Sequence, residues 1–273
     1  MPELPEVETT RRGLAPHIVG QTVTTLTIRQ PKLRWPIAAQ PLQTLIGKPL
    51  RELQRRGKYL LFSFPSGTLL IHLGMSGSLK LVPCTQPPHR HDHLDIGWSN
   101  HLLLRLTDPR RFGAVLWSEG DTLHPLLQPL GPEPLSDAFT HHTLQQAVAN
   151  KRRAIKLAIM DNRIVVGVGN IYANEALFQA RIAPQQAAGN LSSAQISALS
   201  TAIKATLTRA IEAGGTTLKD FVGGDGKPGY FQQQLMVYGR EGEPCGHCAS
   251  TIKKIVLGQR ASYFCPKCQA KSL

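Results

Sequence analysis

The chain has 273 residues, with 31 Lys and Arg against 18 Asp and Glu, which gives a formal net charge of +13. This length exceeds an average domain of ~100–200 residues, so two domains with a small appendage are expected. No stretch approaches the ~20 apolar residues of a membrane span, and the acids and prolines at the start do not form a secretion signal. We therefore expect a cytoplasmic protein with a polyanionic partner, nucleic acid first.

The first half of the chain predicts one helix followed by short strands. The helix is expected over 5–12, with Gly13 near its end. From 20 to 119, apolar or alternating runs recur at the roughly 8–12 residue spacing of an antiparallel sandwich or barrel. The clearest predicted strands are Lys58–Phe64, Thr68–Leu73, Ser78–Val82, Leu102–Leu106 and Ala114–Trp117. Hairpin turns are predicted at 65–67 and 98–100.

A change of pattern marks a domain boundary. The stretch 130–137 contains Gly131, Pro132 and Pro134 and has no periodicity. Beyond it, apolar residues recur at three-and-four spacing, which predicts helices. These helices are expected over Thr140–Asn150, Arg152–Met160, Asn170–Ala180 and Ser192–Ala213. A half rich in strands followed by a helical half indicates an α+β chain.

Four cysteines near the end of the sequence have the spacing of a metal site. Two residues separate Cys245 from Cys248 and Cys265 from Cys268, and sixteen residues lie between the two pairs. This spacing predicts four thiolate ligands around one structural zinc ion, with no open position for activating water. The residues between the pairs predict a β-hairpin that presents Arg260 at its tip, either as a functional cation or as a solvated residue.

A glycine-rich segment leads into the third of these helices. Gly167 and Gly169 precede Asn170, which is expected to cap a helix whose N–H groups and positive dipole end can hold a phosphate. A tight turn between two packed helices would use the same residues. Cationic runs without acids cover 150–156 and 244–273. Both runs are candidate phosphate-contacting patches, which favours DNA as the partner.

The amino terminus combines a candidate nucleophile with two carboxylates. A penultimate proline normally permits removal of Met1, which would expose the secondary amine of Pro2. An α-amino group has a pKa of about 8, so more of it is unprotonated at neutral pH than of a lysine. Attack on a sugar carbon would give a cationic iminium that promotes elimination, with Glu3 and Glu6 as proton donor and second carboxylate. The alternative is a set of ordinary first-turn residues.

Six motifs occur in an order that resembles a known family. They are Pro2–Glu8, His72–Gly77, Asp108–Gly113, Gly167–Tyr172, Gly226–Tyr230 and the four cysteines. In this order, and over the whole chain, they resemble the bacterial formamidopyrimidine-DNA glycosylases. The leucine at position 4 resembles this family, because the sister endonuclease VIII enzymes typically have Gly at that position.

The resemblance implies a fold and an activity. The fold would have an N-terminal antiparallel β-sandwich with flanking helices at 1–134, a helix-two-turns-helix DNA-binding domain with a lesion-capping loop at 135–240, and a zinc finger at 241–273. The enzyme would bind damaged double-stranded DNA as a monomer, with no obligate protein partner and one structural Zn²⁺. It would excise 8-oxoguanine and formamidopyrimidines and cleave the strand by β,δ-elimination on the bacterial nucleoid.

The resemblance also implies roles for individual residues. Pro2 would be the Schiff-base nucleophile, Glu3 the acid that assists ring opening and Glu6 a supporting carboxylate. Lys58 and Arg260 would each contact a phosphate, and they would donate protons in β- and δ-elimination respectively. The residues implied to contact DNA are His72, Met75, His91, Arg110, Phe112, Lys151, Asn170 and Tyr172.

Several alternatives stay open. Met75, Arg110 and Phe112 resemble a trio that fills the space left by the extruded nucleotide, but core packing would also explain Met75 and Phe112. A zinc-dependent DNA-binding regulator would explain the charge and the cysteines and leave Pro2 without a role. An endonuclease VIII-like enzyme would prefer oxidised pyrimidines. Covalent trapping separates enzyme from binder, and paired 8-oxoguanine and thymine-glycol duplexes separate the two enzymes.

Overall fold

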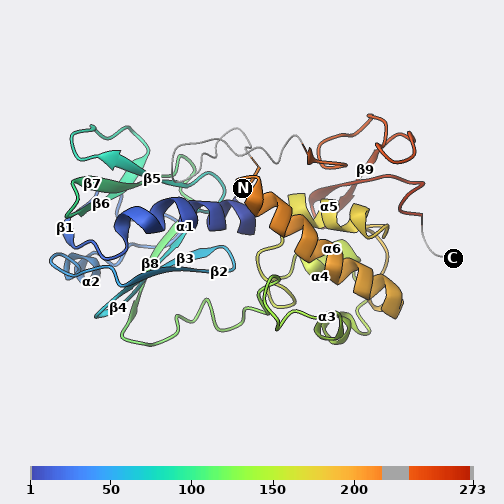
Figure 1. Cartoon of the computed structure of the whole chain (residues 1–273), viewed down its shortest axis with the longest axis horizontal. Helices are drawn as coiled ribbons and strands as arrows, with labels where there is room; N and C mark the ends of the chain where they lie inside the picture. The colour runs from blue at the N-terminus through green and yellow to red at the C-terminus, as the bar shows by residue number, and fades with distance from the viewer. Residues whose placement is uncertain (1, 217–233, 271–273) are drawn as a thin grey trace. The chain divides into compact units, whose positions relative to one another are not determined.

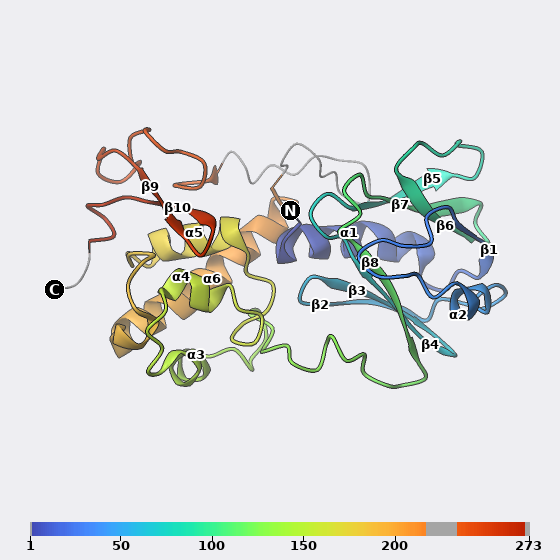
Figure 2. The ribbon, with the colours of Figure 1, turned by 180° about the vertical axis from the view of Figure 1, so that it is seen from behind.

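The computed structural model describes residues 2–216 and 234–270, and the chain divides into two compact units. Figures 1 and 2 show one unit dominated by strands and one dominated by helices. The Gly226–Tyr230 motif and nearly all of the expected lesion-capping stretch, 216–230, lie outside the described residues. The two units are Met1–Gln128 with Ala213–Gln232, and Pro129–Glu212 with Gln233–Leu273.

The first unit is built on an antiparallel β-sandwich, which confirms the expected fold. One sheet has the strand order β1-β6-β7-β5 and the other β2-β3-β4-β8. The strands are β1 (Val23–Ile28), β2 (Glu52–Arg56), β3 (Tyr59–Phe64), β4 (Gly67–His72), β5 (Ser78–Pro83), β6 (Asp92–Trp98), β7 (Leu102–Thr107) and β8 (Ala114–Glu119). All neighbouring strands run antiparallel, as short hairpin connections favour.

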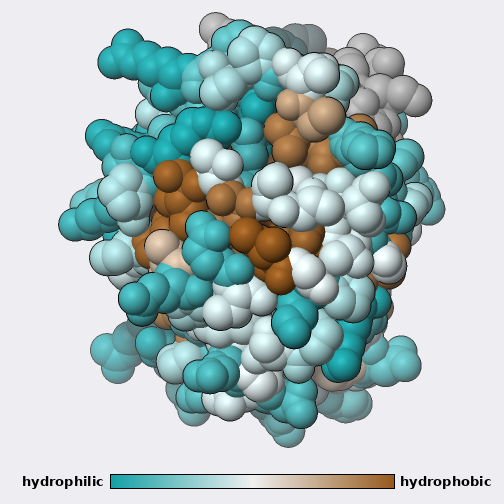
Figure 3. Space-filling model, turned by 90° about the vertical axis from the view of Figure 1, so that its left-hand side faces the viewer, coloured by the Kyte–Doolittle hydropathy of each residue, from teal (hydrophilic) through white to brown (hydrophobic). Residues whose placement is uncertain are grey.

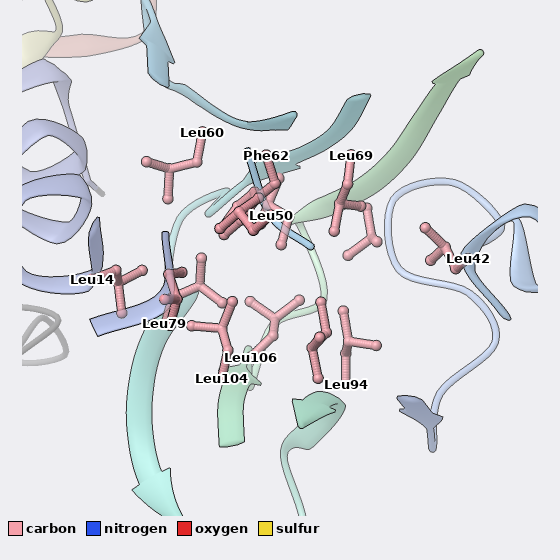
Figure 4. Packing of buried hydrophobic residues seen from close by; sticks show 14 of the residues in the cluster. Leu14, Leu42, Leu50, Leu60, Phe62, Leu69, Leu79, Leu94, Leu104 and Leu106 are labelled. Carbon is pink, nitrogen blue, oxygen red and sulfur yellow. The ribbon is translucent and has the colours of Figure 1, made fainter. Parts of the chain in front are cut away.

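Apolar side chains from both sheets share one core. In β3 every second residue is buried, because successive side chains of a strand point to opposite faces. Figure 4 shows Leu60, Phe62 and Leu69 of one sheet packed in the same cluster as Leu104 and Leu106 of the other. The sandwich therefore gives the loops between its strands a rigid base.

Two helices flank this sandwich, and the first is longer than predicted. α1 (Leu4–Ile18) packs against β2, β3 and β5, and α2 (Ala39–Gln43) packs against β1. The prediction that the helix ends near Gly13 is wrong, because Leu14 and Ile18 are fully buried in the sandwich core. Tertiary packing here outweighs the low helix propensity of Gly13 and of Pro16.

The second unit contains the remaining helices and a β-hairpin. They are α3 (His141–Val148), α4 (Ile155–Ile159), α5 (Asn170–Gln179), α6 (Ser193–Glu212), the 3₁₀ helix η1 (Ala188–Asn190), β9 (Lys253–Leu257) and β10 (Arg260–Phe264). α5 packs against α6 and β10. The helix expected from Arg152 begins only at Ile155, because Ala154 forms a β-bridge with Ala187 and the Ile155 N–H donates to the Gln186 carbonyl at 2.7 Å.

Within 2–216 and 234–270, none of the helices combines the length and the apolar character that a membrane span requires. Figure 3 shows the end of the first unit near α2 and β1, where a limited apolar area is surrounded by hydrophilic side chains.

Candidate active site and nucleic-acid interface

The start of α1 brings Glu3 and Glu6 together. Glu3 is the N-cap residue, and its backbone N–H donates to Glu6 Oε2 at 2.8 Å, while the Glu6 backbone N–H is directed at the Glu3 carboxylate. This capping box places both carboxylates at the positive end of the helix dipole. Pro2, Glu3 and Glu6 are all buried. Because the Glu3 N–H belongs to the Pro2–Glu3 peptide, the Glu6 carboxylate anchors Pro2.

The other oxygen of Glu6 is held by the chain that follows α6. The Thr216 backbone N–H donates to Glu6 Oε1 at 2.8 Å. Gly215 has a φ of +81°, and a Cβ at this position would lie 3.1 Å from Glu6 Oε1, so glycine permits this close approach. Both Glu6 oxygens therefore accept backbone N–H groups, which suits a supporting role better than proton transfer.

A neutral histidine lies beside Lys58. Lys58 occupies the turn between β2 and β3, and His72 ends β4 with its ring 4.8 Å from the Tyr59 ring. Burial, and then the positive charges of Lys58 and Arg34, lower the pKa of His72 to about 4. The Gly74 N–H donates to His72 Nδ1 at 3.0 Å, so the ring proton resides on Nε2. His72 can therefore meet DNA as a neutral donor and not as a cation.

We expect His72 to destabilise the fold in mild acid. Because folding lowers its pKa from 6.5 to about 4, the unfolded chain binds a proton in this range that the folded chain does not. Stability must then fall as the pH drops from 6.5 towards 4, by about 3 kcal/mol in total. Denaturant unfolding of the parent and of His72→Gln at pH 7 and pH 4 measures the effect. Equal losses of stability in the two proteins would contradict this account.

The expected void-filling residues are exposed and lie on loops that touch. The side chains of Met75 and Phe112 are 36% and 46% exposed, which core packing does not produce. The Arg110 guanidinium carbon lies 5.0 Å from the centre of the Phe112 ring. Gly74 has a φ of +64°, and a Cβ there would lie 2.4 Å from the Phe112 carbonyl carbon. The structure therefore brings the Met75 loop against the loop of Arg110 and Phe112.

His91 lies next to the same loops. Its carbonyl accepts the Asp108 N–H at 3.0 Å, and its half-buried ring lies edge-on to His93 with 6.4 Å between ring centres. A surface cavity of about 410 Å³ opens beside it. The basic residues that line this cavity are Lys80, His89, Arg90, His91 and Arg105. Asp92 also lines the cavity, and Arg105 is buried and paired with Asp95, so Lys80 and Arg90 are the lining cations that suit an anionic backbone.

The start of α5 differs from the prediction in its cap. Gly169, and not Asn170, is the N-cap residue, and Asn170 is the first helical residue. The Asn170 Oδ1 atom is buried and accepts no hydrogen bond within the part of the chain that the structure describes, so this side chain does not cap the helix. The Tyr172 side chain is 1% exposed and lies in the interior, which does not fit a direct contact with DNA.

One cation of the expected phosphate patch has a different role. Lys156 is completely buried in α4, and its Nζ donates to the Ala261 carbonyl and to Ser262 Oγ, both at 2.7 Å. Lys156 therefore holds β10 and cannot reach a phosphate, which corrects its place in the patch. Lys151, in contrast, is partly exposed after α3 and remains a candidate contact.

The four cysteines form a compact thiol cluster. Their Sγ atoms all lie within 4.8 Å of one another. The Cys245–Cys268 and Cys248–Cys265 sulfur pairs are 3.9 and 3.4 Å apart, close to the ~3.8 Å that tetrahedral zinc with bonds of about 2.3 Å requires. The donor set and its geometry fit one structural zinc ion. Cys84 is exposed and lies in the first unit, outside this set.

The hairpin between the cysteine pairs presents Arg260 beside its tip. Leu257 of β9 pairs with Arg260 of β10 across a two-residue turn. Gly258 and Gln259 have φ values of +52° and +62°, as a type I′ hairpin turn requires. Arg260 is exposed. The structure therefore confirms the predicted hairpin and leaves the guanidinium accessible to a phosphate.

Sequence reasoning missed buried charged residues that support these loops. In the first unit Arg105 donates to both oxygens of Asp95 at 2.9 and 2.8 Å, and its guanidinium also donates to the backbone carbonyls of Gln86 and Pro87. The only signal in the sequence is the interruption of apolar strands by charged residues. Such an interruption does not reveal which charges are paired inside the fold.

Known proteins match this chain over nearly its whole length. The formamidopyrimidine-DNA glycosylase N-terminal domain matches residues 1–115, the H2TH domain of this glycosylase matches 130–222, and a zinc finger found in this glycosylase and in IleRS matches 242–271. A formamidopyrimidine-DNA glycosylase of Magnetococcus marinus is 55% identical over 98% of this chain and 99% of its own. One from Pseudomonas aeruginosa is 56% identical over 98% of this chain and 100% of its own.

Solved structures agree with this assignment. Lactococcus lactis Fpg bound to DNA with an abasic site superposes with a TM-score of 0.92 at 34% identity, covering 99% of this chain and 100% of that one. MutM (Fpg) of Thermus thermophilus gives 0.89 at 39% identity, with both chains fully covered. The α+β fold, the helix-two-turns-helix region and the zinc finger are all confirmed. The chain therefore belongs to the formamidopyrimidine-DNA glycosylase family.

Proposed function

We propose that this protein is a base-excision repair enzyme, a DNA glycosylase with AP lyase activity that acts on oxidised purines. Solved relatives are complexes with DNA that contains Fapy-dG, carbocyclic 8-oxo-G or an abasic site. The observation that carries the proposal is the capping box at the start of α1, in which Glu6 anchors Pro2 while Glu3 lies beside it.

The chemistry follows from this arrangement. The amine of Pro2 attacks C1′ of the damaged nucleotide, the glycosidic bond breaks, and the base leaves with the bonding electrons and gains a proton. Glu3 moves protons at the sugar as the ring opens to an iminium. Loss of a C2′ proton then breaks the C3′–O bond, and a second elimination breaks the C5′–O bond. Lys58 and Arg260 would supply protons to these steps.

Cys245, Cys248, Cys265 and Cys268 would hold one zinc ion, which crosslinks the finger and takes no part in the reaction. We retain the three-part division 1–134, 135–240 and 241–273, and a monomer that acts in the bacterial cytoplasm on the nucleoid. His72, Met75, His91, Arg110, Phe112, Lys151 and Asn170 would contact DNA. Tyr172 would support the start of α5 from inside.

Paired substrates test the proposed activity. The processed enzyme is incubated with duplexes that carry either 8-oxoguanine or thymine glycol, with and without borohydride. We expect excision and a covalent protein–DNA adduct with 8-oxoguanine, at a much higher rate than with thymine glycol. Faster action on thymine glycol would indicate an enzyme for oxidised pyrimidines. Binding to both duplexes without cleavage or adduct would indicate a DNA-binding regulator.

Salt dependence tests the proposed phosphate contacts. Lys58, Lys151 and Arg260 are each replaced by a neutral residue, and affinity for lesion duplex is measured over a range of salt concentrations. Each replacement should reduce the slope of log affinity against log salt by about one, because one fewer counterion is released on binding. Lys48→Met, which removes an exposed lysine outside the proposed contact set, serves as the comparison and should leave the slope unchanged. A residue whose loss does not alter the slope is not in the interface.

A further inference from the structure

We propose that Asp108 is a positioning residue for nucleotide extrusion, because it joins the Met75 loop and the Arg110–Phe112 loop into one rigid wedge. Asp108 follows β7 directly and is completely buried. Its Oδ1 accepts the Ser76 hydroxyl at 2.8 Å, and its Oδ2 accepts the Gly113 N–H at 2.8 Å. One carboxylate thus holds a residue directly after Met75 and a residue directly after Phe112.

The Ser76 hydroxyl extends this connection. While it donates to Asp108, its oxygen also accepts the backbone N–H of Arg110 at 3.2 Å. Ser76 is buried, so water does not compete for these bonds. The link from Asp108 through Ser76 to Arg110 therefore ties the two loops together at a second point.

The backbone of Asp108 anchors this unit to β6 and to its own loop. Its carbonyl accepts His93 Nε2 at 2.8 Å and the Arg111 N–H at 3.2 Å. Its N–H donates to the His91 carbonyl at 3.0 Å. Arg111 has a φ of +55°, a conformation that costs a non-glycine residue energy and persists only where neighbours determine it. The hydrogen bond from the Arg111 N–H to the Asp108 carbonyl is one of the contacts that hold this conformation.

The space around this carboxylate is equally constrained. A Cβ on Gly113 would lie 2.9 Å from Asp108 Oδ2 and 3.0 Å from the His72 carbonyl oxygen. Only glycine lets the backbone reach the carboxylate this closely. The apolar tips of Met75 and Phe112 stay exposed while the backbone beneath them is held from inside.

This arrangement fits a specific task in the proposed reaction, and the inference rests on that proposed function. A wedge fills the space left by an extruded nucleotide only if its side chains are already in place, since ordering two loops at that moment would cost free energy. Asp108 is buried beneath the loops and does not touch the DNA. It acts by presenting Met75, Arg110 and Phe112 in one orientation.

The test compares excision with cleavage at a site that has no base. Asp108→Asn preserves size, but its amide nitrogen cannot accept the hydrogen bond that one carboxylate oxygen now accepts. In single-turnover assays we expect it to slow excision of 8-oxoguanine from duplex about tenfold or more, because a hydrogen bond to a charged group is lost. Cleavage at a preformed abasic site should change by less than ~threefold, because no base must leave the stack.

If Asp108→Asn does not fold, Ser76→Ala repeats the test. It should also slow excision of 8-oxoguanine more than cleavage at an abasic site, but by a smaller factor than Asp108→Asn. Asp95→Asn is the matched control, since Asp95 is also a buried carboxylate of this unit and its partners, Arg29 and Arg105, carry none of the wedge side chains. It should change both rates by the same factor. If Asp108→Asn also slows both substrates equally, Asp108 is only structural and the proposal is wrong.

A double variant connects Asp108 to the wedge. If Asp108 acts through the wedge of Met75, Arg110 and Phe112, then Asp108→Asn combined with Phe112→Ala should slow excision by less than the product of the two single losses. Losses that multiply would overturn the proposal. If Phe112→Ala slows excision of 8-oxoguanine more than cleavage at an abasic site, and Asp108→Asn does not, this inference is rejected. The proposed function would remain intact. Equal losses of Phe112→Ala on both substrates would reject the wedge itself, and with it the role of Asp108.

Discussion

Enzyme that retains Met1 should form no covalent adduct with lesion DNA in the presence of borohydride. The nitrogen of Pro2 would then be an amide, whose lone pair is delocalised into the peptide bond and cannot attack C1′. Correctly processed enzyme should give an adduct that maps to its first residue. Mass spectrometry of the trapped complex measures both outcomes. The expected effect is a complete loss, since no other group is proposed as nucleophile.

Glu3→Gln is the informative companion variant. It keeps the size of the side chain at the N-cap of α1 but removes the group that transfers protons at the reacting sugar. We expect it to bind lesion duplex with nearly unchanged affinity and to trap poorly on an intact damaged base. An adduct from processed parent enzyme that maps to Lys58 would show that Pro2 is not the nucleophile.

Cys248→Ser should release the zinc ion and unfold the finger. The four sulfurs lie within 4.8 Å of one another, and Cys245 and Cys265 are part of a small core with Phe178 and Val237. Zinc binding by such modules is worth on the order of 10 kcal/mol, which this core cannot replace. We expect loss of one zinc per chain, measured by metal analysis, together with a loss of DNA affinity because Arg260 is no longer held in place.

Cys84→Ser is the matched control for this experiment. Cys84 is exposed and lies in the first unit, apart from the thiol cluster. It should retain full zinc content and unchanged affinity. Full zinc content in Cys248→Ser, with parent-like binding, would argue against a four-thiolate site.

Local patterns in the sequence predict much of this structure. Short apolar or alternating runs between turn residues identify β3, β4 and β5 to within about one residue, and β3 shows the two-residue repeat of a strand most clearly. The spacing of the cysteines is similarly sufficient for the zinc site, since the geometry of a tetrahedral ion restricts how its ligands are spaced. β6 was not among the clearest strands, because its seven residues are all buried and include charged Asp92 and Asp95.

The sequence by itself determined the fold class, the metal site and the residues most suited to chemistry at the amino terminus. Only the tertiary structure decided how far α1 extends, that Lys156 is buried, that Gly169 caps α5, and that Asp108 joins two loops. The physical reason is the range of the interactions. Periodicity, turns and metal spacing act between near neighbours in the chain, whereas folding determines the partners of a buried charge. Ser76 before β5 and Asp108 after β7 meet only because these two strands pair.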